Sequence, residues 1–185
     1  MRTTIRSFSL IALLLATYVR PAHAQDLSKA DLRDMLLQVR QWQEYPQCGD
    51  SVYWSIVKLG KPALPLLIEL IADSSKTAVV RPCSKENLAL GDLAFKVADE
   101  IASLPLFQIT HMQFCLAGGK CDLDFPDGYL DFVAQNRQRF TSQVKTWYEQ
   151  NAGRIEQEYL TKHVTNDCRR ANGLDYRLAF ARQDR

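Results

Sequence analysis

The five cysteines are the residues of this chain whose types and spacing indicate chemistry most directly. Cys115 and Cys121 enclose five residues that include two adjacent glycines, which allow the tight reversal that brings two sulfur atoms to bonding distance. We therefore expect a local disulfide between them. Cys48 and Cys83 flank a predicted helical hairpin that returns the chain to its starting end, and we expect a second disulfide there. Cys168 is then a free thiol, a link between two molecules, or a replacement for one of these partners, because spacing does not fix connectivity.

A metal site is the alternative for the same region. His111 and Cys115 are four residues apart and would share a helical face, and Cys121 follows them. Zinc usually takes a fourth ligand, and no residue of matching spacing supplies it. A nucleophilic pair of His111 with Cys115 or Cys168 would be disabled by disulfide bonding. We therefore expect no metal and no other cofactor.

The acidic stretch Asp122–Asp131 has a superficial likeness to a calcium-binding loop. An acid stands at the sixth position of this loop instead of the fifth, its glycine is one place late, and Val133 occupies the position of the bidentate glutamate. We therefore expect a solvated loop in which Asp127 caps the next helix.

The sequence contains no nucleophile elbow, zinc-protease motif, dinucleotide-binding motif or phosphate loop. His163 lies beside Lys162 near a predicted helix end, where we expect a surface role. These observations predict a protein that is not an enzyme. The enzyme alternative is a small metal-dependent hydrolase that uses His111 and the Cys115–Asp131 loop.

Residues 1–24 have the three parts of a secretory signal peptide: an arginine-containing start, an apolar run, and an A-x-A site that ends at Ala24. Cleavage after Ala24 would give a periplasmic or secreted protein, and disulfides persist in such compartments. Cleavage removes three arginines and no acid, which leaves 20 of the 23 basic residues against 21 acidic ones, a net charge of −1. This balance gives no argument for nucleic acid as a partner. No later apolar run is long enough for membrane insertion.

Residues 25–185 predict one helical domain. The helical spacing of apolar residues predicts a first helix within residues 25–45, capped by Ser28. It predicts a second helix within residues 50–60, capped by Asp50 or Ser51 and ended by Gly60. A third predicted helix covers residues 62–73. Residues 105–127 predict a loop-rich insert, and helices with Arg137 on a polar face follow. We expect residues 167–185 to be a mobile tail with a possible tether at Cys168. No alternating run predicts a strand, so we expect an all-α fold.

The residues 59–67, Leu-Gly-Lys-Pro-Ala-Leu-Pro-Leu-Leu, resemble a HEAT-type helical repeat together with Leu70 and Asp73. The resemblance covers Val52–Asp73, and a weaker second unit extends it to Leu104. It implies a small right-handed array of antiparallel helix hairpins. Two units are fewer than a self-supporting array needs, so we expect flanking helices to close the core and the disulfides to staple it. It also implies a binding surface, but no activity.

The candidate contact surface combines aromatic residues around the first helix junction, Trp42, Tyr45, Tyr53 and Trp54, with Asp92. Asp92 stands at the start of an apolar helix, where it either caps that helix or presents a charge to a partner. We therefore expect an exported soluble protein that binds another protein. The specific hypothesis is a periplasmic immunity protein that inhibits an interbacterial toxin, and an envelope housekeeping scaffold is the alternative. The partner would be an exported toxin or an envelope enzyme.

Overall fold

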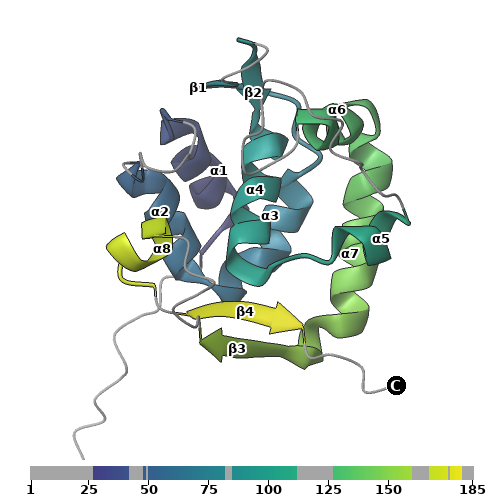
Figure 1. Ribbon diagram of the computed structural model, residues 1–185. Helices are drawn as coiled ribbons and strands as arrows, with labels where there is room; N and C mark the ends of the chain where they lie inside the picture. Colours follow the sequence, from purple (N-terminus) through teal and green to yellow (C-terminus); the bar gives the residue numbers. More distant parts are fainter. Residues whose placement is uncertain are drawn as a thin grey trace, which may run out of the picture.

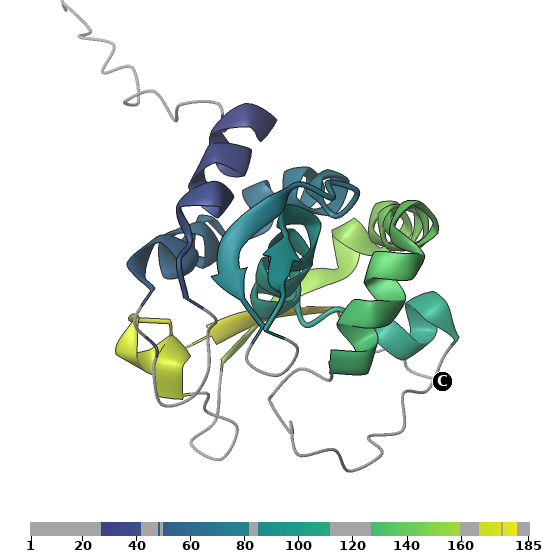
Figure 2. The same ribbon diagram turned by 90° about the horizontal axis from the view of Figure 1, so that it is seen from above.

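A buried helix, α4 (Leu90–Ala102), lies at the centre of the structure, and the other elements pack around it (Figure 1). The computed structural model describes residues 27–41, 48, 50–81, 85–111, 127–159, 167–174 and 176–180. The helices within residues 29–59 lie on one side of α4 and those within 127–151 lie on the other, while the short helix at residues 167–171 lies on the first side (Figure 2). The predicted signal peptide lies outside the described residues, and no helix that is described is both long and apolar enough to cross a bilayer.

The other elements follow in chain order. They are α1 (Lys29–Gln38), α2 (Ser51–Leu59), the 3-10 turn η1 (Lys61–Ala63), α3 (Leu64–Leu70), β1 (Lys76–Val80), β2 (Asn87–Ala89), α5 (Leu106–Thr110), α6 (Asp127–Gln135), α7 (Arg137–Asn151), the 3-10 turn η2 (Ala152–Arg154), β3 (Ile155–Tyr159), α8 (Asp167–Ala171) and β4 (Tyr176–Phe180).

The predicted helix caps are confirmed in the N-terminal half. The Ser28 hydroxyl accepts a hydrogen bond from the Asp31 amide at the start of α1, and the Asp31 carboxylate accepts one from the Ser28 amide in return. Asp50 caps α2 by accepting a hydrogen bond from the Tyr53 amide. Gly60 ends α2 with a φ of 64°, a conformation that glycine adopts without a Cβ penalty. Local chemistry therefore sets where these helices begin and end.

Gly91 lets α4 pack closely against the end of α3. A Cβ at this position would lie 2.1 Å from the carbonyl oxygen of Ile71 and 2.5 Å from Nη1 of Arg137. The Gly91 amide also donates a hydrogen bond to the carbonyl oxygen of Asp73, at 2.9 Å. The turn after α3 therefore contacts the first residues of α4 directly.

An aromatic cluster joins α4 to the helices on its other side. The ring of Phe95 on α4 stacks on Tyr129 of α6, with ring centroids 5.8 Å apart, and meets Phe140 of α7 edge to face at 5.0 Å. All three rings are buried. Such pairs contribute about 0.5–1.5 kcal/mol beyond the burial of their surface.

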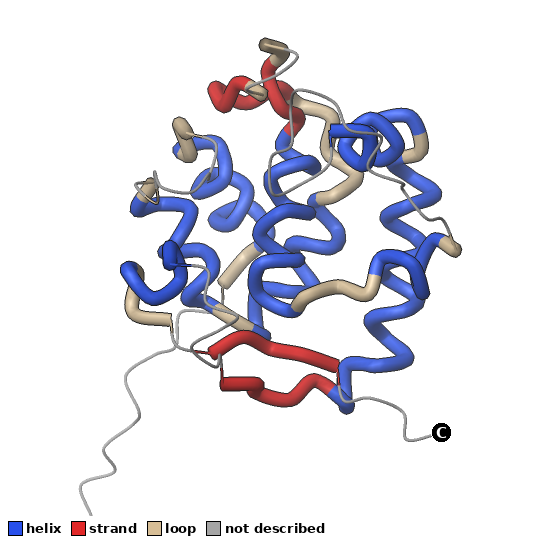
Figure 3. Tube along the Cα trace, in the orientation of Figure 1, coloured by secondary structure: helices blue, strands red, loops and turns tan. Residues whose placement is uncertain are grey.

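Two small antiparallel sheets lie at opposite ends of the helical body (Figure 3). β1 pairs with β2 in an irregular register, and β3 pairs with β4 in a regular one that runs from Ile155 opposite Phe180 to Tyr159 opposite Tyr176. The prediction of a mainly helical protein is confirmed, but the prediction of no strands is wrong. These strands have five residues or fewer, too short to show a clear alternation, and β3 contains residues that favour helices by themselves. Long-range pairing overrides that local preference.

The predicted mobile tail contains two regular elements. α8 carries Cys168, which is bonded to Cys48, and β4 pairs with β3 and contacts α4. The low apolar content of this end of the chain predicted a segment without structure. A disulfide to Cys48 and pairing with β3 hold this segment in a regular structure, although its own residues bury little apolar surface.

Replacing Gly91 with alanine should destabilise the protein by about 2–3 kcal/mol, because the added methyl group meets the Ile71 carbonyl and has no room to move. Urea unfolding measures this change as a lower midpoint. The control is Gly153→Ala, since nothing lies within 4 Å of a Cβ at Gly153; it should change the free energy of unfolding by less than about 0.5 kcal/mol. Equal midpoints for the two variants would show that the close approach is not needed.

Candidate functional site

Charged and polar residues gather at the two ends of α4, and these two clusters are the best candidates for a functional site in the described residues. We call Asp92 and Arg137 the amino-end pair. Tyr53, Asp99, Glu100 and Arg169 form the carboxyl-end cluster. The first decides how three helices meet, and the second lies beside the disulfide.

The amino-end pair is a buried ion pair that ties α3, α4 and α7 together. Oδ1 of Asp92 accepts a hydrogen bond from Nη2 of Arg137 at 2.7 Å, and the two side chains are only 8% and 10% exposed. Nη1 of Arg137 also donates to the carbonyl oxygen of Ile71, at 3.1 Å. Oδ2 of Asp92 accepts a hydrogen bond from the Ala89 amide and so caps α4. The capping alternative for Asp92 is confirmed, and the buried carboxylate is not presented at the surface.

The carboxyl-end cluster fastens α8 to α4. Nη1 of Arg169 donates to Oε1 of Glu100 at 2.7 Å and also to the carbonyl oxygen of Glu100. The side chains are 6% and 13% exposed. A cation at this end of a helix is favoured, because the last carbonyl groups lack partners within the helix and carry partial negative charge. Oδ1 of Asp99 accepts a hydrogen bond from the Leu104 amide just beyond the helix.

Two buried tyrosines face this end of α4. Burial raises the pKa of Tyr53 well above its usual value, and the negative charges of Glu100 and Asp99 raise that pKa further. Burial also raises the pKa of Tyr129 to about 12, although a hydrogen bond with Thr110 lowers it and the charge of Asp99 raises it. Both phenols therefore stay neutral at physiological pH and are poor proton donors.

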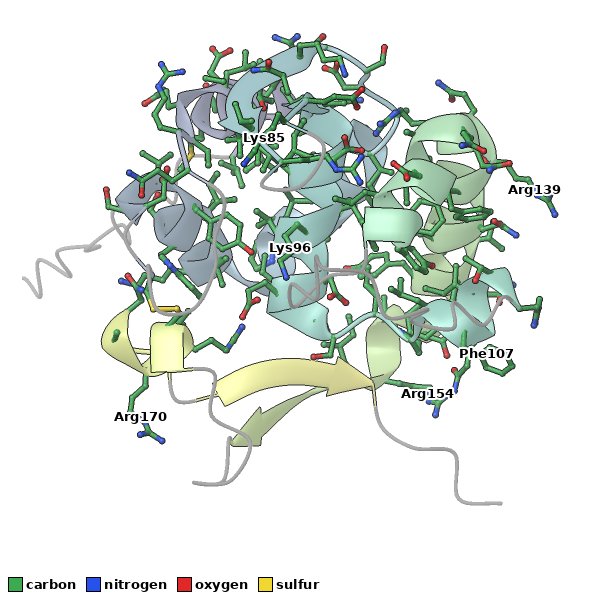
Figure 4. The ribbon with its side chains drawn as sticks, turned by 45° about the horizontal axis from the view of Figure 1, so that its top comes forward. Lys85, Lys96, Phe107, Arg139, Arg154 and Arg170 are labelled. Carbon is green, nitrogen blue, oxygen red and sulfur yellow. A yellow bond between two sulfur atoms is a disulfide. The ribbon has the colours of Figure 1, made fainter. Side chains whose placement is uncertain are left out.

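A disulfide joins Cys48 to Cys168 across a sequence separation of 120 residues, with 4.9 Å between the Cα atoms. Figure 4 shows the bond beside α8. The expected pairing of Cys48 with Cys83 is wrong, and Cys168 is neither free nor a link between molecules. The prediction considered only the return of the hairpin that starts near Cys48, whereas the distant C-terminal segment folds back to the same place. Cys83 lies outside the described residues, as do Cys115 and Cys121, whose pairing stays a prediction.

A third pair accounts for one residue of the acidic loop. Nη1 of Arg81, just after β1, donates to Oδ1 of Asp131 in α6 at 2.7 Å, and the two side chains are 9% and 56% exposed. Asp131 thus contributes to the attachment of α6. Asp122 and Asp124 lie outside the described residues, and among the described ones no three His, Cys, Asp or Glu side chains are grouped to hold a metal ion.

The predicted contact surface around Tyr53 and Trp54 is wrong for these two residues. They are 1% and 2% exposed and pack in the core, with their rings edge to face at 5.3 Å. Tyrosine and tryptophan are common both in cores and in binding sites, so residue type alone did not separate the two roles. Trp42 and Tyr45 lie outside the described residues.

His111 ends α5 in a left-handed conformation, with a φ of 57°, and it is exposed to solvent. Cys115 and Cys121, the other two members of the alternative metal site, are outside the described part of the chain, and so is His163.

The roles of Arg137 and Arg169 in the two clusters were not predicted from the sequence. Helical spacing put Arg137 on a polar face, and Arg169 lay in the expected tail. The sequence signal that could have located Arg137 is Gly91 followed by Asp92. A glycine at this position indicates close packing of two helices, and a buried carboxylate beside it needs a cation as its partner. No signal of this kind marks Arg169.

Comparisons of the chain with models of protein families, with curated proteins and with solved structures give no match.

Replacing Arg137 with methionine should destabilise the protein by about 3–5 kcal/mol, because Asp92 would keep a buried charge without its partner. Chemical denaturation measures the loss, and adding Asp92→Asn should recover part of it. The control is Arg33→Met, which removes a more exposed ion pair with Asp73 and should cost less than about 1 kcal/mol. A similar loss in both variants would contradict a special role for the amino-end pair.

The free energy of unfolding should fall as the pH rises above about 10. Tyrosines in the unfolded chain ionise near pH 10, whereas the raised pKa values keep Tyr53 and Tyr129 protonated in the folded protein. The unfolded state therefore loses protons first, and high pH favours it. Unfolding curves across this pH range measure the effect, and Tyr53→Phe should make the decline shallower. An unchanged decline in that variant would argue against the assignment to Tyr53.

Proposed function

We propose that this chain is an exported helical protein that acts by binding another protein. Two features support export: the signal-peptide pattern of residues 1–24 and the Cys48–Cys168 disulfide. Disulfides form and persist in the periplasm and outside the cell, and are rare in the cytosol.

The observation that carries the binding role is that the buried polar and charged residues of the described part serve the fold. Each of six such residues forms at least one hydrogen bond within the chain: Asp50, Thr77, Arg81, Asp92, Thr110 and Arg169. The buried hydroxyl of Tyr53 has no hydrogen-bond partner among the described residues. Groups that are committed to internal partners stabilise one arrangement of the helices. A protein built in this way presents a fixed surface, and a fixed surface binds with little loss of conformational entropy.

The arrangement we propose for that surface is HEAT-like. α2 and α3, which flank the turn at Gly60, both contact α4, the single helix of the weaker second unit. The exposed aromatic residue Phe107 adds a contact candidate on α5: it is 56% exposed, and its side chain points away from the body of the protein (Figure 4). Aromatic residues are enriched among those that dominate binding energy.

In its specific form the proposal is a periplasmic immunity protein that inhibits an interbacterial toxin. Export, small size and a disulfide-fastened body suit a protein that must meet and block a toxin outside the cytoplasm. Deletion of the gene should make a strain lose in competition with its parent, and the full chain supplied in trans should restore survival. The control is a version without residues 2–24, which should stay in the cytoplasm and give no protection.

Equal survival of the deletion strain and its parent would overturn the immunity role. In parallel, the tagged full chain is isolated from periplasm under non-reducing conditions, and the bound proteins are identified. Recovery of a toxin that the chain inhibits in purified form supports the proposal. Recovery of a self-encoded envelope complex would replace immunity with a scaffold role, and the absence of any stoichiometric partner would count against binding altogether.

A further inference from the structure

The helix α8 lies in the connection between β3 and β4, and the strand pair itself closes the base of this connection. Tyr159, the last residue of β3, stands opposite Tyr176, the first residue of β4. β4 also contacts α4, which holds the strand pair on the helical body. A movement of α8 therefore requires no change in the pairing of the strands, and this helix can open as a local unit.

The other half of the disulfide also lies in a connection. Cys48 stands between α1 and α2, and α2 has its own cap, because Asp50 accepts a hydrogen bond from the Tyr53 amide. The aromatic cluster and the amino-end pair are built on α4, α6 and α7 and contain no residue of α8. The disulfide thus joins two connections, and these contacts between the main helices do not pass through it.

The contacts that hold α8 in place gather on Cys48 and Glu100. Cys168 is bonded to Cys48, and Nδ2 of Asn172, just beyond the helix, donates to the carbonyl oxygen of Cys48 at 3.5 Å. Nη1 of Arg169 donates to Oε1 of Glu100. A helix of five residues is unstable by itself, and a buried ion pair loses in hydration much of what it gains in attraction. The docking of α8 therefore depends strongly on the disulfide.

The two cysteines of this bond differ in accessibility. Cys168 is 4% exposed, whereas Cys48 is half-buried, so a thiolate from solvent reaches the sulfur of Cys48 more easily. Attack there forms a mixed disulfide with Cys48 and releases Cys168 as a thiolate. The second thiol of a dithiol reductant then displaces Cys48. Two electrons and two protons pass to the protein in this exchange, and the dithiol becomes a disulfide.

We propose that the Cys48–Cys168 disulfide is a redox switch: it holds α8 against the carboxyl end of α4 when oxidised, and a dithiol reductant that opens it releases α8. The helical body stays folded in both states. Release separates Arg169 from Glu100 and uncovers this end of α4 near Tyr53. Burial raises the pKa of Tyr53, whereas the charge of Arg169 lowers it, which places the guanidinium near that phenol. The inference goes beyond the proposed function, because it holds for any partner.

The test compares amide hydrogen exchange of the oxidised full chain with that of the same chain in dithiothreitol. The amides of Gly173 and Leu174 donate to carbonyl oxygens of α8. Their exchange should become at least about tenfold faster on reduction, whereas amides of α3 and α7 should change by less than about twofold.

A variant separates this bond from any bond among the other cysteines. Cys48→Ser/Cys168→Ser, measured without reductant, should exchange at α8 as fast as the reduced parent, and dithiothreitol should not accelerate its α8 amides further. Reduction of the folded parent keeps the test valid if the serine variant does not fold.

A second measurement asks whether the ion pair survives reduction. Arg169→Met should lower the urea midpoint of the oxidised protein and leave that of the reduced protein unchanged, because a released α8 no longer presents Arg169 to Glu100. The control is Arg170→Met on the same helix, whose exposed side chain points away from the body (Figure 4). It should change neither midpoint.

Two results would each overturn the proposal by showing that α8 stays docked. One is unchanged exchange of α8 after a thiol count has shown complete reduction, and the other is an equal loss of stability for Arg169→Met in both redox states. Loss of helical circular dichroism on reduction, with faster exchange throughout α3, α4 and α7, would overturn it too. The bond would then be a requirement for the whole fold and not a local switch.

Discussion

The contact between the first turn of α4 and the carbonyl oxygen of Ile71 is the constraint on which the helical body depends. It requires a residue without a side chain at position 91, and only Gly91 meets this requirement. The close approach brings Ile71 and Asp92 within reach of one guanidinium, that of Arg137. Three helices therefore meet through a single cation, and their relative positions are coupled.

The two ends of α4 carry charges that suit the polarity of a helix. The carboxylate of Asp92 lies at the amino end, and the guanidinium of Arg169 lies at the carboxyl end. Burying ions costs hydration energy, and a buried pair often contributes less stability than apolar residues of the same size would. These pairs instead fix the relative positions of the helices. Each guanidinium also donates a hydrogen bond to one particular backbone carbonyl, so a helix that shifted would lose both the ion pair and this hydrogen bond.

Interactions between residues close together in the sequence were predictable, whereas those between distant residues were not. Ser28, Asp50 and Gly60 act on backbone groups a few residues away, and their roles were predicted from local rules. The partner of Cys48 and the strand β4 depend on contacts with distant parts of the chain, and neither was predicted. Of the candidate site, Asp92 was predicted with its cap among the alternatives, whereas its cation was not. The buried residues Tyr53 and Trp54 were wrongly predicted to form a contact surface. Aromatic residues are common both in protein cores and in binding sites, so their type did not show which role they have.

The disulfide also bears on the order in which the chain is made. Synthesis proceeds from the amino end, so Cys83, Cys115 and Cys121 all appear before Cys168, while Cys48 appears before any of them. For most of synthesis, the native partner of Cys48 does not yet exist and three other thiols do. The native bond therefore requires either that Cys48 stays reduced until the chain is nearly complete or that an earlier bond is exchanged. In the first case an oxidant must act after Cys168 has been made, and in the second a thiolate must attack the earlier bond and release the wrong partner of Cys48.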